Sequence, residues 1–186
     1  ALAEKAAELG MADRFTFIQC DLSLAGAAIR LARDLRRNLP TIDALIFCAR
    51  HLTTDQVITA EGFEQIFASF YVSRAILSLG LIEPLERAEA PIILNVAGPG
   101  QPGEIDWDDI DRSASYVGIA ALGQAGRATE LFGRTFVDDP RVARTKYVSV
   151  FPGVVATGFS GSYDAEWTER IAQLKKTAMP ASDAIL

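Results

Sequence analysis

Cysteine is scarce in this chain, since Cys20 and Cys48 are the only two among 186 residues. They do not form the closely spaced pairs of a metal site, so neither zinc binding nor redox chemistry is expected. Two unpaired cysteines are typical of a reducing compartment, and we predict buried thiols and a cytoplasmic location. No apolar run approaches the ~20 residues that a bilayer span requires, so no membrane role is expected.

An excess of positive charge is also lacking. Lys and Arg number 18 against 24 Asp and Glu, which gives a net charge of −6 at pH 7, and the basic residues are scattered. Binding to a phosphate backbone needs clustered basic residues, so no nucleic-acid partner is expected. The hydrophobic fraction of 49% and the charged fraction of 23% are those of an ordinary globular protein. The length fits one domain spanning residues 1–186.

What the sequence does contain is an alternation of two patterns, which is typical of an α/β fold with a parallel sheet. Short β-branched or aromatic runs predict strands at 15–20, 42–48, 91–96 and 147–151. Longer segments with helical spacing follow them, from Leu24 to the stop at Leu39-Pro40, from 61 to 85 and from 120 to 136. The run at 42–48 is almost continuously apolar, so it is predicted to be a central strand buried on both faces.

Two groups of side chains have both a structural and a functional interpretation. The aromatic residues of the 61–85 helix, beginning with Phe63 and Phe67, fit a core better than a ligand cage. The acidic residues between Glu104 and Asp111 fit a solvated loop better than a metal site, because no histidine or paired spacing accompanies them. No metal is therefore predicted.

Segments that match the motifs of a known family occur in one order along residues 1–160. Asp21 in Cys-Asp-Leu-Ser matches an aspartate that the family has after its third strand, and residues 43–50 occupy the position of a family strand that ends in Asn-Asn-Ala-Gly. Residues 59–68 match the start of the helix that follows that strand. Residues 104–110 correspond to the family's Ile-Asp-x-Asp-Asp loop, and residues 151–157 to its Pro-Gly-x-Val-x-Thr motif. Taken together, they resemble the short-chain dehydrogenase/reductase family, and most of all its retinol-dehydrogenase-like branch.

The resemblance implies a doubly wound, Rossmann-like parallel sheet in a single α/β domain. The first two strands of the family, and the glycine-rich turn after the first of them, have no counterpart in the sequence. We therefore expect a chain that is incomplete at its N-terminus. We expect the same at its C-terminus, where Ala181-Ser182-Asp183 has the composition of a new helix start.

The resemblance also implies NAD or NADP as a cofactor. It assigns cofactor binding to Asp21, Ala49, Arg50, Pro152, Gly153 and Thr157. Arg50 replaces the glycine of Asn-Asn-Ala-Gly, so it either fills the adenine side of the cleft, contacts a phosphate, or is a solvent-exposed residue at a strand end. Asp21 is equally suited to cap a helix, and Pro152-Gly153 to form a turn.

The catalytic positions differ from those of the family, which uses a Tyr as general acid, a Lys four residues later, a Ser and an Asn. The matching positions hold Leu122, Gly126, Gly98 and Phe70, respectively. Loss of a general acid typically slows a reaction about 10²–10⁴-fold, so conventional hydride transfer is expected to be weak or absent. Tyr116 is the one tyrosine with a chance of reaching the cleft, from the preceding loop.

Two hypotheses about function follow. In the first, the chain is an enzyme that takes a small organic molecule, either as an NAD(P)-dependent oxidoreductase or as a non-redox enzyme that reuses the cleft. In the second, it is a non-catalytic partner or regulatory subunit. It then forms a homo-oligomer, or a hetero-oligomer with a related chain, through the helices at 61–85 and 120–136. Titration with NADH and NADPH discriminates between them.

Overall fold

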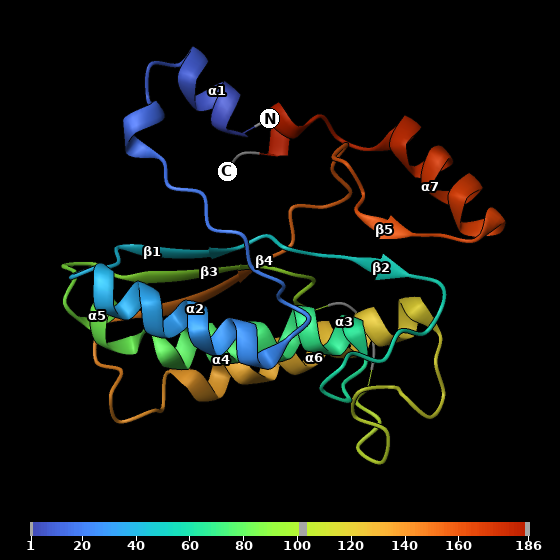
Figure 1. The fold of residues 1–186 in the computed structure, drawn as a ribbon. Helices are drawn as coiled ribbons and strands as arrows, with labels where there is room; N and C mark the ends of the chain where they lie inside the picture. Colours follow the sequence, from blue (N-terminus) through green and yellow to red (C-terminus); the bar gives the residue numbers. More distant parts are fainter. Residues whose placement is uncertain (1, 101–103, 185–186) are drawn as a thin grey trace.

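The computed structural model describes residues 2–100 and 104–184 (Figure 1). The helices are α1 (Leu2–Glu8), α2 (Ala25–Asn38), α3 (Gln65–Phe67), α4 (Ser73–Gly80), α5 (Ile82–Glu86), α6 (Gly118–Phe136) and α7 (Ala165–Thr177). The strands are β1 (Ala44–Phe47), β2 (Leu52–Thr53), β3 (Ile92–Val96), β4 (Lys146–Val150) and β5 (Gly161–Ser162). A π-helical turn lies at Ala68–Val72, and 3₁₀ turns lie at Ala12–Arg14 and Ala181–Ala184.

The main sheet is parallel, with the strand order β1-β3-β4. Its register places Ile46 beside Leu94 and Leu94 beside Val148. Parallel neighbours require crossover connections, and the helical segments α3 to α5 and the long helix α6 supply them. The predicted α/β, Rossmann-like class is therefore confirmed, with the strands of the 91–96 and 147–151 predictions in the sheet.

The core lies between one face of this sheet and three helices. In Figure 1, α2, α4 and α6 all run beneath the same face. Phe47 and Ile93 point to this side and pack with Leu81 and Phe136 in one buried cluster. Burial of this cluster holds the helices on the strands. The carboxyl ends of the strands are left free to form a site.

The predicted strand at 15–20 is wrong. These residues form no strand, and the Phe17 side chain is 81% exposed. A strand is stable only when a neighbour takes up its backbone hydrogen bonds, and no strand pairs with this segment in the described residues. The segment has the apolar composition of a strand, but composition does not by itself supply a pairing partner.

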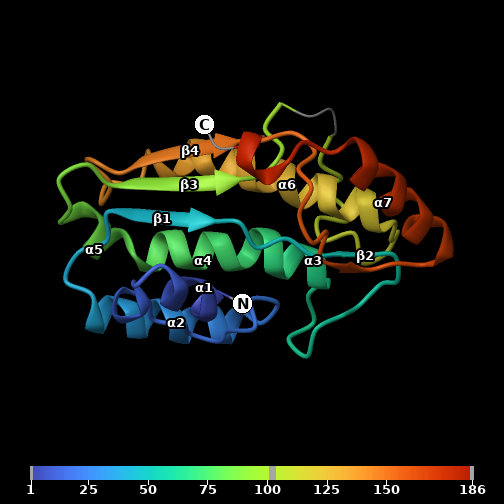
Figure 2. The same cartoon turned by 90° about the horizontal axis from the view of Figure 1, so that it is seen from above.

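The run at 42–48 forms β1, but the prediction of a central strand is wrong. β1 pairs only with β3, so it is an edge of the described sheet, as Figure 2 shows. Phe47 faces the helices and is buried, whereas Ile46 on the opposite face is 58% exposed. Because no helix covers that face over β1, the apolar alternate residues remain in contact with solvent.

The predicted helix at 61–85 is interrupted rather than continuous. It begins at Gln65, where the Glu64 carboxylate caps it by accepting a hydrogen bond from the Phe67 amide at 2.8 Å. A π-helical turn follows α3, and the chain leaves helical geometry at Leu81 before α5. Glu61 lies before the helix and instead accepts hydrogen bonds from the amides at the start of α2.

The prediction of buried thiols is also wrong, although both cysteines are free. Cys48 is exposed and Cys20 is half-buried. Cys48 follows the last residue of the edge strand β1, and Cys20 follows the unpaired segment, so neither has a covering layer. Within the described ranges, no helix is both long and apolar enough to cross a bilayer.

Candidate functional site

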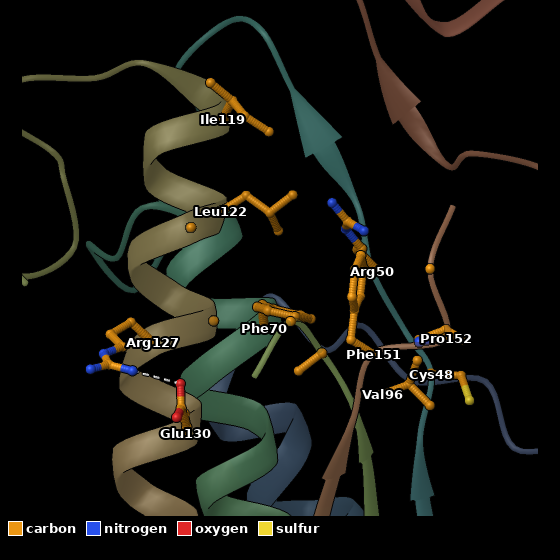
Figure 3. Close-up of a pocket in the computed structure, with 15 residues that line it drawn as sticks. Cys48, Arg50, Phe70, Val96, Ile119, Leu122, Arg127, Glu130, Phe151 and Pro152 are labelled. Carbon is orange, nitrogen blue, oxygen red and sulfur yellow. Dashed lines mark hydrogen bonds and ion pairs between the residues drawn. The ribbon is translucent and has the colours of Figure 1, made fainter. Parts of the chain in front are cut away.

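A cavity of about 420 Å³ opens at the carboxyl ends of β1, β3 and β4, beside α6 (Figure 3; hereafter the cleft). In open parallel sheets this edge is where ligands bind. Seven of the ten residues assigned from the resemblance line the cleft: Arg50, Phe70, Gly98, Leu122, Gly126, Pro152 and Gly153. Segments far apart in the sequence therefore converge on one place, as the motif order predicted.

The α6 helix and the π-helical turn form the wall at the predicted catalytic positions. Leu122 and Gly126 are one helical turn apart, so both face the cleft from α6. Phe70 comes from the π-helical turn, and its ring lies 3.4 Å from where a Cβ on Gly126 would stand. These side chains contain no group that can donate or accept a proton.

The other three assigned residues do not line the cleft. The Asp21 carboxylate accepts hydrogen bonds from the Ser23 amide at 2.9 Å and the Ser23 hydroxyl at 2.7 Å, which lower the pKa of Asp21. This is the structural alternative, a turn leading into α2. The Ala49 carbonyl accepts a hydrogen bond from the Arg74 guanidinium, and the Thr157 amide donates a hydrogen bond to the Val155 carbonyl.

Tyr116 does not line the cleft either. Its hydroxyl donates to the Thr53 carbonyl at 2.8 Å and lies 2.7 Å from the Thr53 hydroxyl oxygen. Burial raises the pKa of Tyr116, which is the direction opposite to that required of a general acid-base group at neutral pH. The hydroxyl thus ties the loop before α6 to β2.

Acidic side chains of the segment 104–111 form hydrogen bonds and an ion pair within their own loop. Asp109 accepts hydrogen bonds from the amides of Ala114 and Ser115, and Asp106 forms a 3.0 Å ion pair with Arg112. Among residues 2–100 and 104–184, no group of three or more His, Cys, Asp or Glu is arranged to hold a metal ion. These contacts agree with the interpretation of a solvated loop.

Three ionised residues line the cleft. Arg127 and Glu130 neutralise each other in a 2.8 Å ion pair on α6, visible in Figure 3. Arg50 lies across the cleft, after β1, and is exposed. Protein atoms nonetheless displace part of its hydration, which lowers the pKa of Arg50, while the nearby Tyr163 phenol opposes the change. A guanidinium in this setting stays charged.

Sequence reasoning missed Arg74, which lies directly behind the cleft. It is only 2% exposed, and its guanidinium donates to Asn95 Oδ1, to the Val96 carbonyl at 3.0 Å and to the Ala49 carbonyl at 2.7 Å. It also stacks on the Phe70 ring, 4.0 Å from the centroid. Burial lowers the pKa of Arg74 to about 10, so it remains charged at neutral pH.

Two polar residues within apolar patterns could have pointed to this arrangement. Arg74 interrupts a run of apolar residues in a predicted helix, and Asn95 interrupts the strand 92–96. Both are buried, and a buried polar group normally has a partner. Arg74 joins the ends of β1 and β3, so it fixes the spacing of the strands that form the cleft floor.

Comparison with known proteins was made by sequence and by structure. No family model matches the chain. Over 98 residues it is 29% identical to the NmrA-like family domain-containing oxidoreductase notO of Aspergillus sp. (strain MF297-2), covering 52% of this chain and 30% of that protein. Over 136 residues it is 24% identical to the polyprenol dehydrogenase of Homo sapiens, covering 70% and 41%. The matches thus span less than half of either relative.

Solved structures define the fold. A short-chain dehydrogenase from Streptomyces avermitilis superposes with a TM-score of 0.65 at 16% identity, covering 98% of this chain and 68% of that one. A short-chain dehydrogenase from Shigella flexneri complexed with NADP has a TM-score of 0.56 at 15% identity, covering 84% and 64%. The chain therefore has the fold of short-chain dehydrogenases, as the motif order indicated. The retinol-dehydrogenase-like branch stays a prediction.

Proposed function

We propose that this chain is a binding protein with the short-chain dehydrogenase fold, whose cleft holds a small organic molecule with an apolar body, without the family's acid-base chemistry. One observation carries the proposal: Phe70, Gly98, Leu122 and Gly126 all border a single cavity. By the family resemblance, these positions correspond to those that hold, orient and protonate the reacting oxygen. An apolar wall there favours binding by exclusion of water over proton transfer.

A nicotinamide cofactor fits the described residues only in part. When bound, it would supply a hydride; Pro152 and Gly153 line the cleft, and by the family resemblance they would hold its nicotinamide end. Gly153 has a φ of 83°, so the turn after β4 brings bare backbone to the surface. The described residues contain no glycine-rich turn to hold a pyrophosphate. Binding of NAD or NADP, like a cytoplasmic location, stays a prediction.

A second candidate function is the non-catalytic subunit, which pairs with a related chain or a second copy. It rests on the family resemblance, which implies an interface through the helices at 61–85 and 120–136; the uncovered face of β1, where Ile46 is 58% exposed, is another surface that can be tested. Sedimentation of the purified chain and of Ile46→Lys separates the cases. A dimer that Ile46→Lys dissociates favours pairing with a second copy, and a monomer in both samples contradicts that pairing.

The binding proposal is tested with a neutral apolar fluorophore, N-phenyl-1-naphthylamine, and with NADH and NADPH. Leu122→Trp fills the cleft and is expected to weaken binding of the fluorophore at least about ten-fold, since a bulky ring displaces the ligand. Val137→Trp is the matched control, because Val137 follows the same helix, is 47% exposed and does not line the cleft. It should bind like the wild type.

Two results would contradict this proposal. The first is equal fluorophore binding by Leu122→Trp and the wild type, because the molecule would then bind elsewhere. The second is rapid NADH- or NADPH-dependent reduction of an aldehyde or ketone panel by the wild type. Such turnover would require a proton donor that the cleft wall at Leu122 and Gly126 does not offer.

A further inference from the structure

The charges around the cleft are not balanced. Arg127 and Glu130 cancel, so Arg50 is left as the one ionised lining residue without an opposite charge. Among the described residues, no carboxylate forms an ion pair with Arg50. The chain as a whole carries a net charge of −6, so positive potential at the cleft is a local property of these residues and not of the surface in general.

A second positive charge lies immediately behind the cleft wall. The Arg74 guanidinium stacks on Phe70, whose ring lines the cleft, and it donates to the carbonyl of Val96, another lining residue. Its three hydrogen-bond acceptors are all neutral oxygens, so no carboxylate compensates its charge. A charge surrounded by protein rather than water is weakly screened, and its field therefore reaches into the cleft.

Arg50 and Arg74 carry like charges and repel each other. The Arg50 charge is one of the causes that lower the pKa of Arg74, after burial. Repulsion between like charges at a cavity is relieved when a negative group enters it. The remaining lining is largely apolar, with Ile119, Leu122 and Phe151 around the space that Arg50 faces in Figure 3.

We propose that the ligand of the cleft is an amphipathic organic anion, with its acidic group paired to Arg50 and its apolar body against Phe70 and Leu122. This inference rests on the proposed binding function and specifies the ligand class. Guanidinium groups pair with carboxylate, sulfonate-like and phosphate oxygens through parallel hydrogen bonds. A neutral ligand of the same shape leaves both arginine charges uncompensated, and a cationic one adds to the repulsion.

Two fluorophores with the same apolar body provide the test. 8-Anilinonaphthalene-1-sulfonate carries an acidic group, and N-phenyl-1-naphthylamine lacks it. The wild type is expected to bind the sulfonate at least about ten-fold more tightly at low ionic strength, the effect of one charge-assisted pair. Arg50→Gln should lose most of this preference and keep only the part due to the Arg74 charge, whereas Arg33→Gln, an exposed position on α2, should keep the preference in full. Added salt should reduce the preference.

The outcomes separate this inference from the proposed function. If the neutral probe binds and Leu122→Trp blocks it, but the sulfonate gains nothing, the binding function holds and the anion preference is wrong. A preference that survives undiminished in Arg50→Gln also overturns the assignment of Arg50. If neither probe binds, or if Leu122→Trp leaves binding of both unchanged, the proposed function and this inference fail together.

Discussion

Replacing Arg74 with Met tests how the cleft floor is held together. Met preserves much of the length of the side chain and its contact with Phe70, but it removes the guanidinium. The Asn95 oxygen, buried at 0% exposure, then loses its Arg74 donor, and so does the partly buried Val96 carbonyl. The Ala49 carbonyl can turn to water, because Ala49 is exposed. The change therefore leaves one or two acceptors unsatisfied.

Two opposing free energies decide the size of the effect. Each hydrogen bond from a charged donor contributes about 1.5–3 kcal/mol to stability, and Arg74 makes three. Burial opposes them: lowering the Arg74 pKa from 12.5 to about 10 corresponds to a cost of about 3 kcal/mol at 1.36 kcal/mol per pKa unit. The bonds exceed the cost of burial. We expect Arg74→Met to lower the free energy of unfolding by about 2–4 kcal/mol.

Urea unfolding of a double-mutant cycle measures this directly. The cycle compares the wild type, Arg74→Met, Asn95→Leu and the double variant, and a coupling free energy of about 1.5–3 kcal/mol is expected between the two positions. Removal of both partners should cost less than the sum of the single changes. If Arg74→Met is as stable as the wild type, desolvation outweighs the hydrogen bonds, and the assignment of Arg74 as a clamp is wrong.

Two further predictions concern other buried positions. Glu64 is fully buried with one carboxylate oxygen unpaired, and burial, with a smaller contribution from Asp111, raises its pKa above the usual 4.5. The folded state therefore holds the proton more tightly, and stability falls as the pH rises above 4.5 through the folded-state pKa. Glu64→Gln should unfold at a higher urea concentration than the wild type at pH 8, and its free energy of unfolding should change less with pH between pH 5 and 8. A variant that is less stable than the wild type at pH 8 contradicts this. On α6, Gly133→Ala places a Cβ 2.6 Å from the Tyr147 ring and should lower the free energy of unfolding by about 1–3 kcal/mol. Gly123→Ala meets nothing within 4 Å and should raise the free energy of unfolding by about 0.5–1 kcal/mol, as measured by thermal unfolding. Equal effects at the two glycines would refute the packing argument.

The sequence was sufficient to predict an element where the element is specified by its own residues and by residues near it in the sequence. The long helix α6 and the strands β3 and β4 were placed to within one or two residues, because their periodicity and turn residues agree with their tertiary surroundings. The seven residues that line the cleft were assigned from the family resemblance and not from periodicity. Parallel strands bring their carboxyl ends to a common edge, so motif order predicts proximity.

The sequence was insufficient where the outcome depends on a partner. The segment 15–20 has the composition of a strand but no strand to pair with, and β1 has the apolar run of a central strand but lies at an edge. Ile46 is exposed because no described helix covers its face of β1, and the local sequence pattern does not encode which elements cover a sheet face. Arg74 was missed for a related reason. Its role depends on carbonyl oxygens from two other strands, and their positions are set by the fold.

Arg74 and Arg50 have separable consequences, even though both contribute positive charge to the cleft. Arg74 is buried and its charge is committed to three oxygens, so its removal should change stability and binding together. Arg50 is exposed and forms no ion pair with a described carboxylate. Arg50→Gln should therefore leave the free energy of unfolding within about 0.5 kcal/mol of the wild type, while most of the anion preference is lost. A loss of stability in Arg50→Gln comparable to that of Arg74→Met would mean that Arg50 is part of the framework. The cleft would then have no unpaired charge to offer a ligand.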